Sequence, residues 1–135
     1  MTTVSENDHI NLLRQHDLRP TRQRIALAGL LFNAPCRHVT AETLRAEVAA
    51  QGIPMSLATI YNTLNQFSRV GLLHEINLDD NVRYFDTNTD HHHHFFDPKT
   101  NDLIDIPAGA IGLRSLPEAP DGRSVERVDV VIRLA

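Results

Sequence analysis

The stretch SLATIYNTLNQFSRVG, residues 56–71, decides the fold of this chain. Ser56 is a preferred helix N-cap residue, and Gly71 is a residue at which helices commonly end. Apolar side chains recur every three or four residues between them: Leu57, Ile60, Leu64, Phe67 and Val70. The opposite face carries short polar side chains with little charge: Thr59, Asn62, Thr63 and Gln66. This spacing predicts an amphipathic helix with one buried and one polar face.

Three shorter helices are predicted on the N-terminal side of this stretch. A residue suited to helix capping precedes each of them: Ser5, Thr21 and Thr40. Asp8 lies three residues after Ser5, which resembles a capping box. Pro20 separates the first two helices, and Gly52 with Pro54 ends the third.

After Gly71 the apolar period changes from about 3.6 residues to two, the period of a strand. Residues 72–78 and 82–86 therefore predict two strands joined by the turn Asp79-Asp80-Asn81. Three helices followed by such a hairpin follow the order of a winged helix-turn-helix. In that motif the helix at residues 56–70 would enter the major groove of DNA.

The rest of the chain predicts a small second domain after a polar hinge at residues 87–90. Residues 91–96 and 102–106 predict strands, residues 107–116 one or two helical turns, and residues 124–134 a long final strand. That last strand places four apolar residues on one face: Val128, Val130, Ile132 and Leu134. Fewer than about 50 residues build a poor core, so we expect this sheet to pack against a second copy.

The fold class predicted from these elements is α+β. Residues 1–86 form a winged helix-turn-helix, and residues 91–135 form a small α/β dimerisation and sensing domain. The chain has 135 residues, a formal charge of −4 and 41% hydrophobic residues, which is typical of a globular protein. No apolar run approaches the roughly 18–20 residues of a membrane span, and no signal peptide is visible, so we expect a cytoplasmic protein.

Charge is distributed unevenly along the chain. Residues 1–8 carry −2, residues 9–74 carry +4 and residues 75–135 carry −6. A basic part joined to an acidic part suggests nucleic acid as a partner of the first. Random scatter is the alternative, and a pI near 6 would by itself argue against DNA binding.

Two groups of residues are candidates for contacts with DNA. The first is the run Arg19-Pro20-Thr21-Arg22-Gln23-Arg24, whose arginines suit phosphate contacts, although it could be only a solvated helix start. The second is the small-residue start of the helix at 56–70, where Ser56 and Thr59 would let the backbone approach DNA. There Tyr61 could touch a phosphate or a thymine methyl, and Asn62 could read adenine. The alternative for Tyr61 is a ring over the edge of the core.

The run His91-His92-His93-His94 is the main candidate for ligand chemistry. On a strand His92 and His94 share one face, and such a pair of imidazoles can hold a transition metal. Carboxylates that could complete the shell stand nearby: Asp86, Asp97, Asp102 and Asp105. A solvated polar turn is the alternative, but Phe95-Phe96 indicates that the run enters a core.

The only cysteine, Cys36, excludes an intrachain disulfide. Within one chain it also excludes zinc sites built on four cysteines, or on two cysteines and two histidines. Cys36 and His38 could pair as nucleophile and base, but no catalytic motif accompanies them. We therefore expect a small apolar role for Cys36, a structural or ligand role for His38, and no enzyme.

Together these motifs resemble the ferric uptake regulator (Fur) superfamily over residues 10–106. The resemblance lies in residues 18–24 (LRPTRQR), 38–42 (HVTAE), 56–67 (SLATIYNTLNQF) and 84–86 (YFD) with the histidine run. Most such proteins carry C-x-x-C pairs for structural zinc, whereas this chain has Asp97 and Thr100 at the first pair. HHHHFF, DLIDI and VERVDVVIRLA resemble the iron response regulator (Irr) branch, which responds to haem.

The resemblance implies site residues, each at the position that matches a family motif. The divalent-metal ligands would be His38, Asp86, His92, His94 and Asp105, and the unbroken run would let His93 replace a neighbour. Haem would be held by His92, His93 and His94. Arg19, Tyr61 and Asn62 match DNA-contacting positions. Some Irr proteins have a Cys-Pro haem motif, but Pro35-Cys36 has the reverse order.

The function predicted from sequence is a homodimeric regulator of iron and haem homeostasis genes. It would bind a near-palindromic double-stranded operator, and haem would relieve that binding. The alternative within the same fold is a Fur-like repressor activated by Fe²⁺, Mn²⁺ or Zn²⁺. A small metalloenzyme that uses the histidine cluster is a rival, but no nucleophile or base motif accompanies it. A metal-storage module is another rival, but it would not need residues 19–24 or the helix at 56–70. Because the two sites share histidines, haem and metal should compete.

Overall fold

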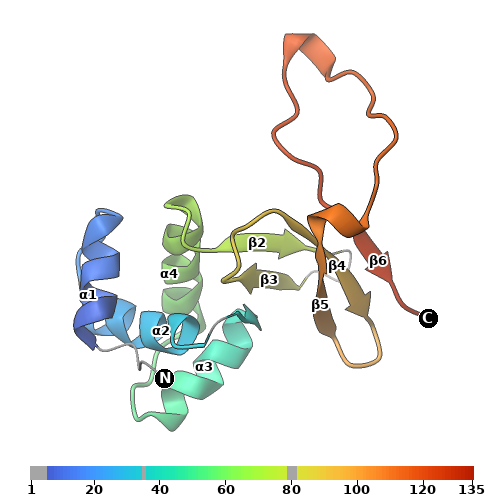
Figure 1. Ribbon diagram of the computed structural model, residues 1–135. Coiled ribbons are helices and arrows are strands. Elements are labelled where there is room, and N and C mark those ends of the chain that lie inside the picture. The colour runs from blue at the N-terminus through green and yellow to red at the C-terminus, as the bar shows by residue number, and fades with distance from the viewer. Residues whose placement is uncertain (1–5, 35, 79–81) are drawn as a thin grey trace. The chain divides into compact units, whose positions relative to one another are not determined.

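The computed structural model divides into two compact units, Met1–Thr89 and Asp90–Ala135 (Figure 1). It describes residues 6–34, 36–78 and 82–135. The division falls within residues 87–90, where the sequence predicts a hinge. The predicted cap at Ser5, the turn at residues 79–81 and Pro35 lie outside the described residues.

Four helices build the described part of the first unit. They are α1 (Glu6–Gln15), α2 (Arg22–Phe32), α3 (Ala41–Ala50) and α4 (Leu57–Arg69). The last three begin at the predicted caps, where a side-chain hydroxyl accepts a hydrogen bond from the third backbone N–H that follows. Thr21 accepts from Arg24, Thr40 from Thr43 and Ser56 from Thr59. Each cap satisfies one backbone donor that the first turn of a helix leaves without a partner.

Helix α4 ends in a tight turn at Gly71, after which the chain returns to the core at Leu72 and Leu73. Gly71 has φ +86°, which costs glycine no steric strain. The N–H of Gly71 donates to the Ser68 carbonyl, and that of Leu72 donates to the Phe67 carbonyl at 2.9 Å, the two bonds of a Schellman motif. Helix α4 contributes fully buried residues to a core shared with the other three helices: Ile60, Leu64 and Phe67.

A small antiparallel sheet completes the first unit. Its strands are β1 (His38–Val39), β2 (His74–Asn77) and β3 (Arg83–Asp86), in the order β1-β3-β2. The predicted strands at 72–78 and 82–86 are shorter than expected, because Leu72 and Leu73 pack into the helical core instead of extending β2. Strand β1 was not predicted, since two residues are too few to show a period.

The second unit is a three-stranded sheet. It consists of β4 (His92–Asp97), β5 (Asp102–Pro107) and β6 (Val131–Arg133), in the order β5-β4-β6. Strand β5 runs antiparallel to β4, and β6 runs parallel to it. Directly paired residues lie on the same face, so Phe95 of β4 lies between Ile104 and Ile132 on one face. His92, His94 and Phe96 lie on the other.

The predicted strand at residues 124–134 is wrong in extent, because only Val131–Arg133 pairs as β6. Histidine side chains also bond the segment just before it. His93 Nδ1 accepts from the Val130 N–H at 3.0 Å, and His91 Nε2 bonds the Val128 carbonyl, while the Val130 carbonyl accepts from the backbone N–H of His94 at 3.1 Å. The helical turns predicted at 107–116 reduce to a 3₁₀ turn, η1 (Ala108–Ala110). A further 3₁₀ turn, η2, spans Pro120–Gly122. Among the described residues no helix has the length and apolar character needed to cross a bilayer.

Candidate metal centre and recognition helix

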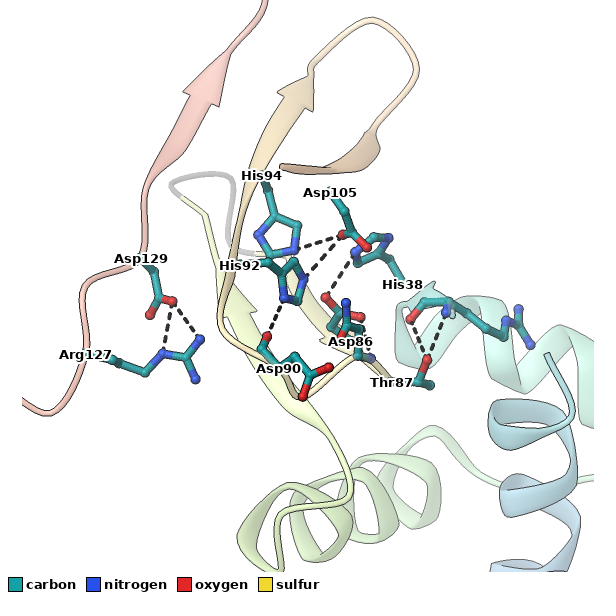
Figure 2. Close-up of polar contacts among 11 residues, drawn as sticks. His38, Asp86, Thr87, Asp90, His92, His94, Asp105, Arg127 and Asp129 are labelled. Atoms are coloured by element: carbon teal, nitrogen blue, oxygen red, sulfur yellow. Dashed lines mark hydrogen bonds and ion pairs between the residues drawn. The ribbon is translucent and has the colours of Figure 1, made fainter. Parts of the chain in front are cut away.

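Three ligand-type side chains of the second unit point toward one another (Figure 2). His92 and His94 share a face of β4, and Asp105 is the residue of β5 paired with His94. The Nε2 atoms of His92 and His94 lie 3.3 Å and 3.4 Å from the same Asp105 oxygen, Oδ1. Their candidate ligand atoms all lie within 4.8 Å of one another. The two imidazoles are buried, and the Asp105 side chain is one-third exposed.

The hydrogen bonding of His92 presents a lone pair to Asp105. Nδ1 of His92 lies 2.5 Å from the carbonyl oxygen of Asp90, and only an N–H can donate a hydrogen bond to that oxygen. A neutral His92 therefore carries its lone pair on Nε2, which faces a carboxylate oxygen. Two acceptors at this distance repel each other unless a proton or a cation lies between them. A backbone carbonyl that fixes the ring in this way is also the usual outer partner of a metal-bound histidine.

The other two histidines of the run face away from this group. His93 is buried and accepts from the Val130 N–H, while His91 is exposed and bonds the Val128 carbonyl. The rings of His91 and His93 are in edge contact, with centroids 5.1 Å apart. The run therefore supplies two candidate metal ligands, and its other two side chains hydrogen-bond the segment that precedes β6.

A second pair of ligand-type side chains lies in the first unit. His38 of β1 and Asp86 of β3 are register partners, and His38 Nε2 lies 3.1 Å from Asp86 Oδ2. Asp86 is fully buried, and its other oxygen accepts from the Asn88 N–H at 2.9 Å. Burying a carboxylate is costly without such partners. The five metal ligands predicted from sequence thus form a pair in one unit and a triad in the other.

The predicted DNA-contacting arginines differ in their surroundings. Arg19 and Arg22 are exposed. Arg24 is half-buried: its Nη1 donates to the Arg19 carbonyl at 2.8 Å, and its Nη2 donates to Gln66 Oε1 on α4 at 2.9 Å. Arg24 therefore braces the start of α2 against α4, and Arg19 and Arg22 are left to face solvent.

The predicted contact residues of α4 also fall into two groups. Ser56 and Asn62 are exposed and Thr59 is half-buried, with the Ser56 hydroxyl donating to Thr59 Oγ1 at 2.9 Å. Tyr61 turns toward α3, where its hydroxyl donates to the Glu42 carboxylate at 3.3 Å, and its ring packs on the core. Burial raises the pKa of the Tyr61 phenol, and Glu42 raises it further. The phenol is thus a hydrogen-bond donor at neutral pH.

Sequence reasoning missed a contact centred on Arg83 of β3. Its Nε donates to the Glu75 carboxylate on β2, and its Nη2 donates to Asn65 Oδ1 on α4 at 2.6 Å. Its Cζ lies 5.4 Å from the ring centre of Tyr61 and 5.3 Å from that of Phe85. The hydrogen bond to Glu75 raises the pKa of the guanidinium. The sequence did contain a signal for this contact, namely the opposite charges of Glu75 and Arg83 on the two strands of the predicted hairpin.

Cys36 is exposed and not part of the core, so the expected apolar role for it is wrong. The neighbouring Arg37 instead organises this loop. Its guanidinium donates to both Glu47 carboxylate oxygens at 2.9 Å and to the Leu30 carbonyl at 2.8 Å. This two-pronged ion pair ties the loop before β1 to α3.

The first unit has the helix and strand order of a winged helix-turn-helix, and the small sheet that follows it carries histidine and aspartate side chains that could hold a metal ion. The profile of the ferric uptake regulator family matches residues 15–128. The ferric uptake regulation protein of Haemophilus ducreyi is 33% identical over 88 residues, which cover 64% of this chain and 59% of that protein. The chain therefore belongs to the ferric uptake regulator family.

Solved structures share the fold at lower identity. The ferric uptake regulator of Vibrio cholerae superposes with a TM-score of 0.72 at 20% identity, covering 93% of this chain and 98% of that one. That of Pseudomonas aeruginosa, solved with manganese, gives 0.71 at 24% identity, covering 93% and 96%. These likenesses establish the α+β fold. The relatives named here are called ferric uptake regulators, and one of them was solved with manganese; none of these descriptions mentions haem.

Proposed function

We propose that this protein is a transcription regulator that binds double-stranded DNA and responds to a divalent metal. The observation that carries this proposal is the family match over residues 15–128, which spans most of both units. Of the two functions weighed from sequence, the metal-activated repressor gains more support from it than the haem-relieved regulator. A regulator of this kind would act in the cytoplasm on genes of iron homeostasis.

Helix α4 with the start of α2 would provide the DNA-binding surface. Exposed Ser56 is the N-cap of α4 and exposed Asn62 stands on its second turn, near the N-terminal end where a recognition helix meets base edges. Arg19 and Arg22 would pair with phosphates, and Thr59 and Tyr61 would complete the surface. Arg24, by its bond to Gln66, would keep the phosphate-binding arginines in register with α4.

The donor set of the triad fits a divalent metal. Two imidazole nitrogens and a carboxylate oxygen suit Fe²⁺, Mn²⁺ or Zn²⁺ rather than a soft ion such as Cu⁺. The lone pair of His92 facing Asp105 gives a cation a place to relieve the repulsion between acceptors. His92, His94 and Asp105 would hold the ion. Its positive charge would lie between the lone pair of His92 Nε2 and the Asp105 carboxylate, which otherwise face each other.

We propose further that His38 and Asp86 complete this metal shell. His92 stands six positions after Asp86, so their Cα atoms are never more than about 22 Å apart. The His38–Asp86 pair offers the same donor types as the triad, and its carboxylate is buried. A cation shared by both groups would favour one arrangement of the units over others, which is the condition for a regulatory ligand.

A second copy of the chain would pack on the apolar face of the second sheet. Ile104 and Ile132 flank Phe95 across the three strands, and they are 49% and 39% exposed. Leu134 extends this apolar surface beyond β6. A two-fold dimer would present two α4 helices to the half-sites of a near-palindromic operator.

The test starts from a randomised duplex pool, selected on the purified protein and sequenced. The enriched duplex is then titrated without metal, with Mn²⁺ or Zn²⁺, and with hemin. We expect metal to tighten binding at least tenfold and hemin to leave it unchanged. Release of the duplex by hemin, with no effect of metal, would restore the haem-responsive function and overturn this proposal.

Arg19 and Asn62 should affect DNA binding in different ways. Arg19→Ala removes a phosphate contact, so it should weaken binding to enriched and scrambled duplexes alike and reduce the salt slope by about one. Asn62→Ala removes a base contact, so it should alter the sequence preference by about 1–3 kcal/mol at one base pair and leave the slope unchanged. Fluorescence anisotropy at several salt concentrations separates the two. If neither variant changes affinity, the assignment of this surface is wrong.

A further inference from the structure

The contacts of Arg83 join four elements of the first unit around one side chain. The guanidinium bonds Glu75 on β2 and Asn65 on α4, and it lies over the ring of Tyr61 on the same helix. Tyr61 in turn bonds Glu42 on α3. A single hydrogen-bonded and stacked cluster therefore connects β2, β3, α3 and α4.

Tyr61 is held by this cluster at both ends of its side chain. Arg83 lies over the ring within the roughly 6 Å at which cation–π attraction operates, and Glu42 accepts from the hydroxyl. Without these two partners, the half-buried ring could exchange between staggered rotamers. The cluster therefore selects one orientation of the residue that precedes Asn62 on α4.

We infer that Arg83 is a positioning residue for DNA recognition, which fixes Tyr61 and Asn65 on α4 and so sets the sequence preference of that helix. This inference rests on the proposed DNA-binding function. It assigns to strand β3 a part in reading the sequence, even though Arg83 itself need not touch a base.

The surroundings of Arg83 favour this role over a phosphate contact. Its charge is already paired with Glu75, and two aromatic rings cover the guanidinium. Its side chain is 36% exposed, whereas Arg19 and Arg22 are open to solvent and form no ion pair with the residues that the structure describes. A phosphate would have to compete with the Glu75 carboxylate for the same donors.

The experiment compares Arg83→Met and Arg83→Lys with the wild type on the enriched and scrambled duplexes defined above. Arg83→Lys keeps the charge but loses the planar, forked guanidinium, and it guards against a folding defect in Arg83→Met. We expect both variants to lower the ratio of specific to non-specific affinity about tenfold, with the salt slope unchanged. Arg45→Met removes an exposed charge from α3 and should leave the ratio at its wild-type value.

A double-mutant cycle with Tyr61→Leu isolates the coupling. If Arg83 acts through Tyr61, the double variant should discriminate no worse than Tyr61→Leu alone. Additive losses, or a salt slope reduced by about one in Arg83→Met and kept in Arg83→Lys, would overturn the inference. A wild-type protein that enriches no duplex would instead refute the proposed function, so the two failures are distinguishable.

Discussion

His94→Ala is expected to lower the affinity for Mn²⁺ and Zn²⁺ more than about 100-fold, because losing a direct ligand costs more than losing an outer partner. His92→Ala should do the same, since both Nε2 atoms face Asp105. Competition against a chromogenic chelator measures the affinity.

The histidine run contains its own control for this experiment. His91 is adjacent to His92 but precedes β4, and its ring contacts the ring of His93 and bonds the Val128 carbonyl. His91→Ala should therefore leave the metal affinity within about threefold of the wild type, since it removes no ligand. Equal losses in His91→Ala and His94→Ala would show that the metal binds the run without regard to strand face.

Metal should also stabilise the folded chain, and this effect should depend on the same ligands. At 100 times the dissociation constant, a ligand specific for the native state adds about 2.7 kcal/mol to the free energy of unfolding. The melting temperature of the wild type should rise with added Mn²⁺, and that of His94→Ala should not. An equal rise in both would place the metal elsewhere.

The second large effect is expected from Ile132→Asp, which should convert a dimer into a monomer. Ile132 is 39% exposed within one chain, so the aspartate is tolerated in the monomer. In a dimer closed over Phe95 the same carboxylate would be buried without a partner, which would raise the dissociation constant at least about 100-fold. Sedimentation velocity at micromolar concentration measures the change.

Val125→Asp is the matched control for this prediction. Val125 is 51% exposed, but it lies outside the three strands of the second sheet. The variant should sediment as the wild type does. A monomeric wild type, or a dimer that survives Ile132→Asp, would show that the apolar face of β4, β5 and β6 is not the interface.

Local signals predicted the helices of the first unit well. The caps at Thr21, Thr40 and Ser56 act through bonds to backbone groups three residues away, so their effect is contained within the local sequence. The ferric uptake regulator family was also recognisable from residues 18–24, 38–42 and 56–67. Its Irr branch and the response to haem remain predictions.

Features that depend on pairing between distant segments could not be predicted. Strand β1 exists because His38 and Val39 pair with β3, about 50 residues further along the chain. The alternation at residues 124–134 predicted a long strand, but only Val131–Arg133 pairs as β6. Side chains of the histidine run bond the backbone of the segment that precedes it. The Arg83 cluster joins residues from four elements, and no local pattern marks such a convergence. Strand period predicted that His92 and His94 share one face, whereas Asp105 was one of four candidate carboxylates until the family resemblance pointed to it.

The four histidines are identical, so they do not by themselves determine the register of β4 in the sheet. A shift of β4 by one residue would still place two imidazoles on the face of Asp105, so the ligand chemistry alone tolerates a slipped strand. In the direction that keeps two imidazoles there, Phe95 would take the buried place of Phe96, and His94 would enter the place between Ile104 and Ile132. The apolar place between the two isoleucines therefore fixes the register of β4 and determines which histidines become ligands.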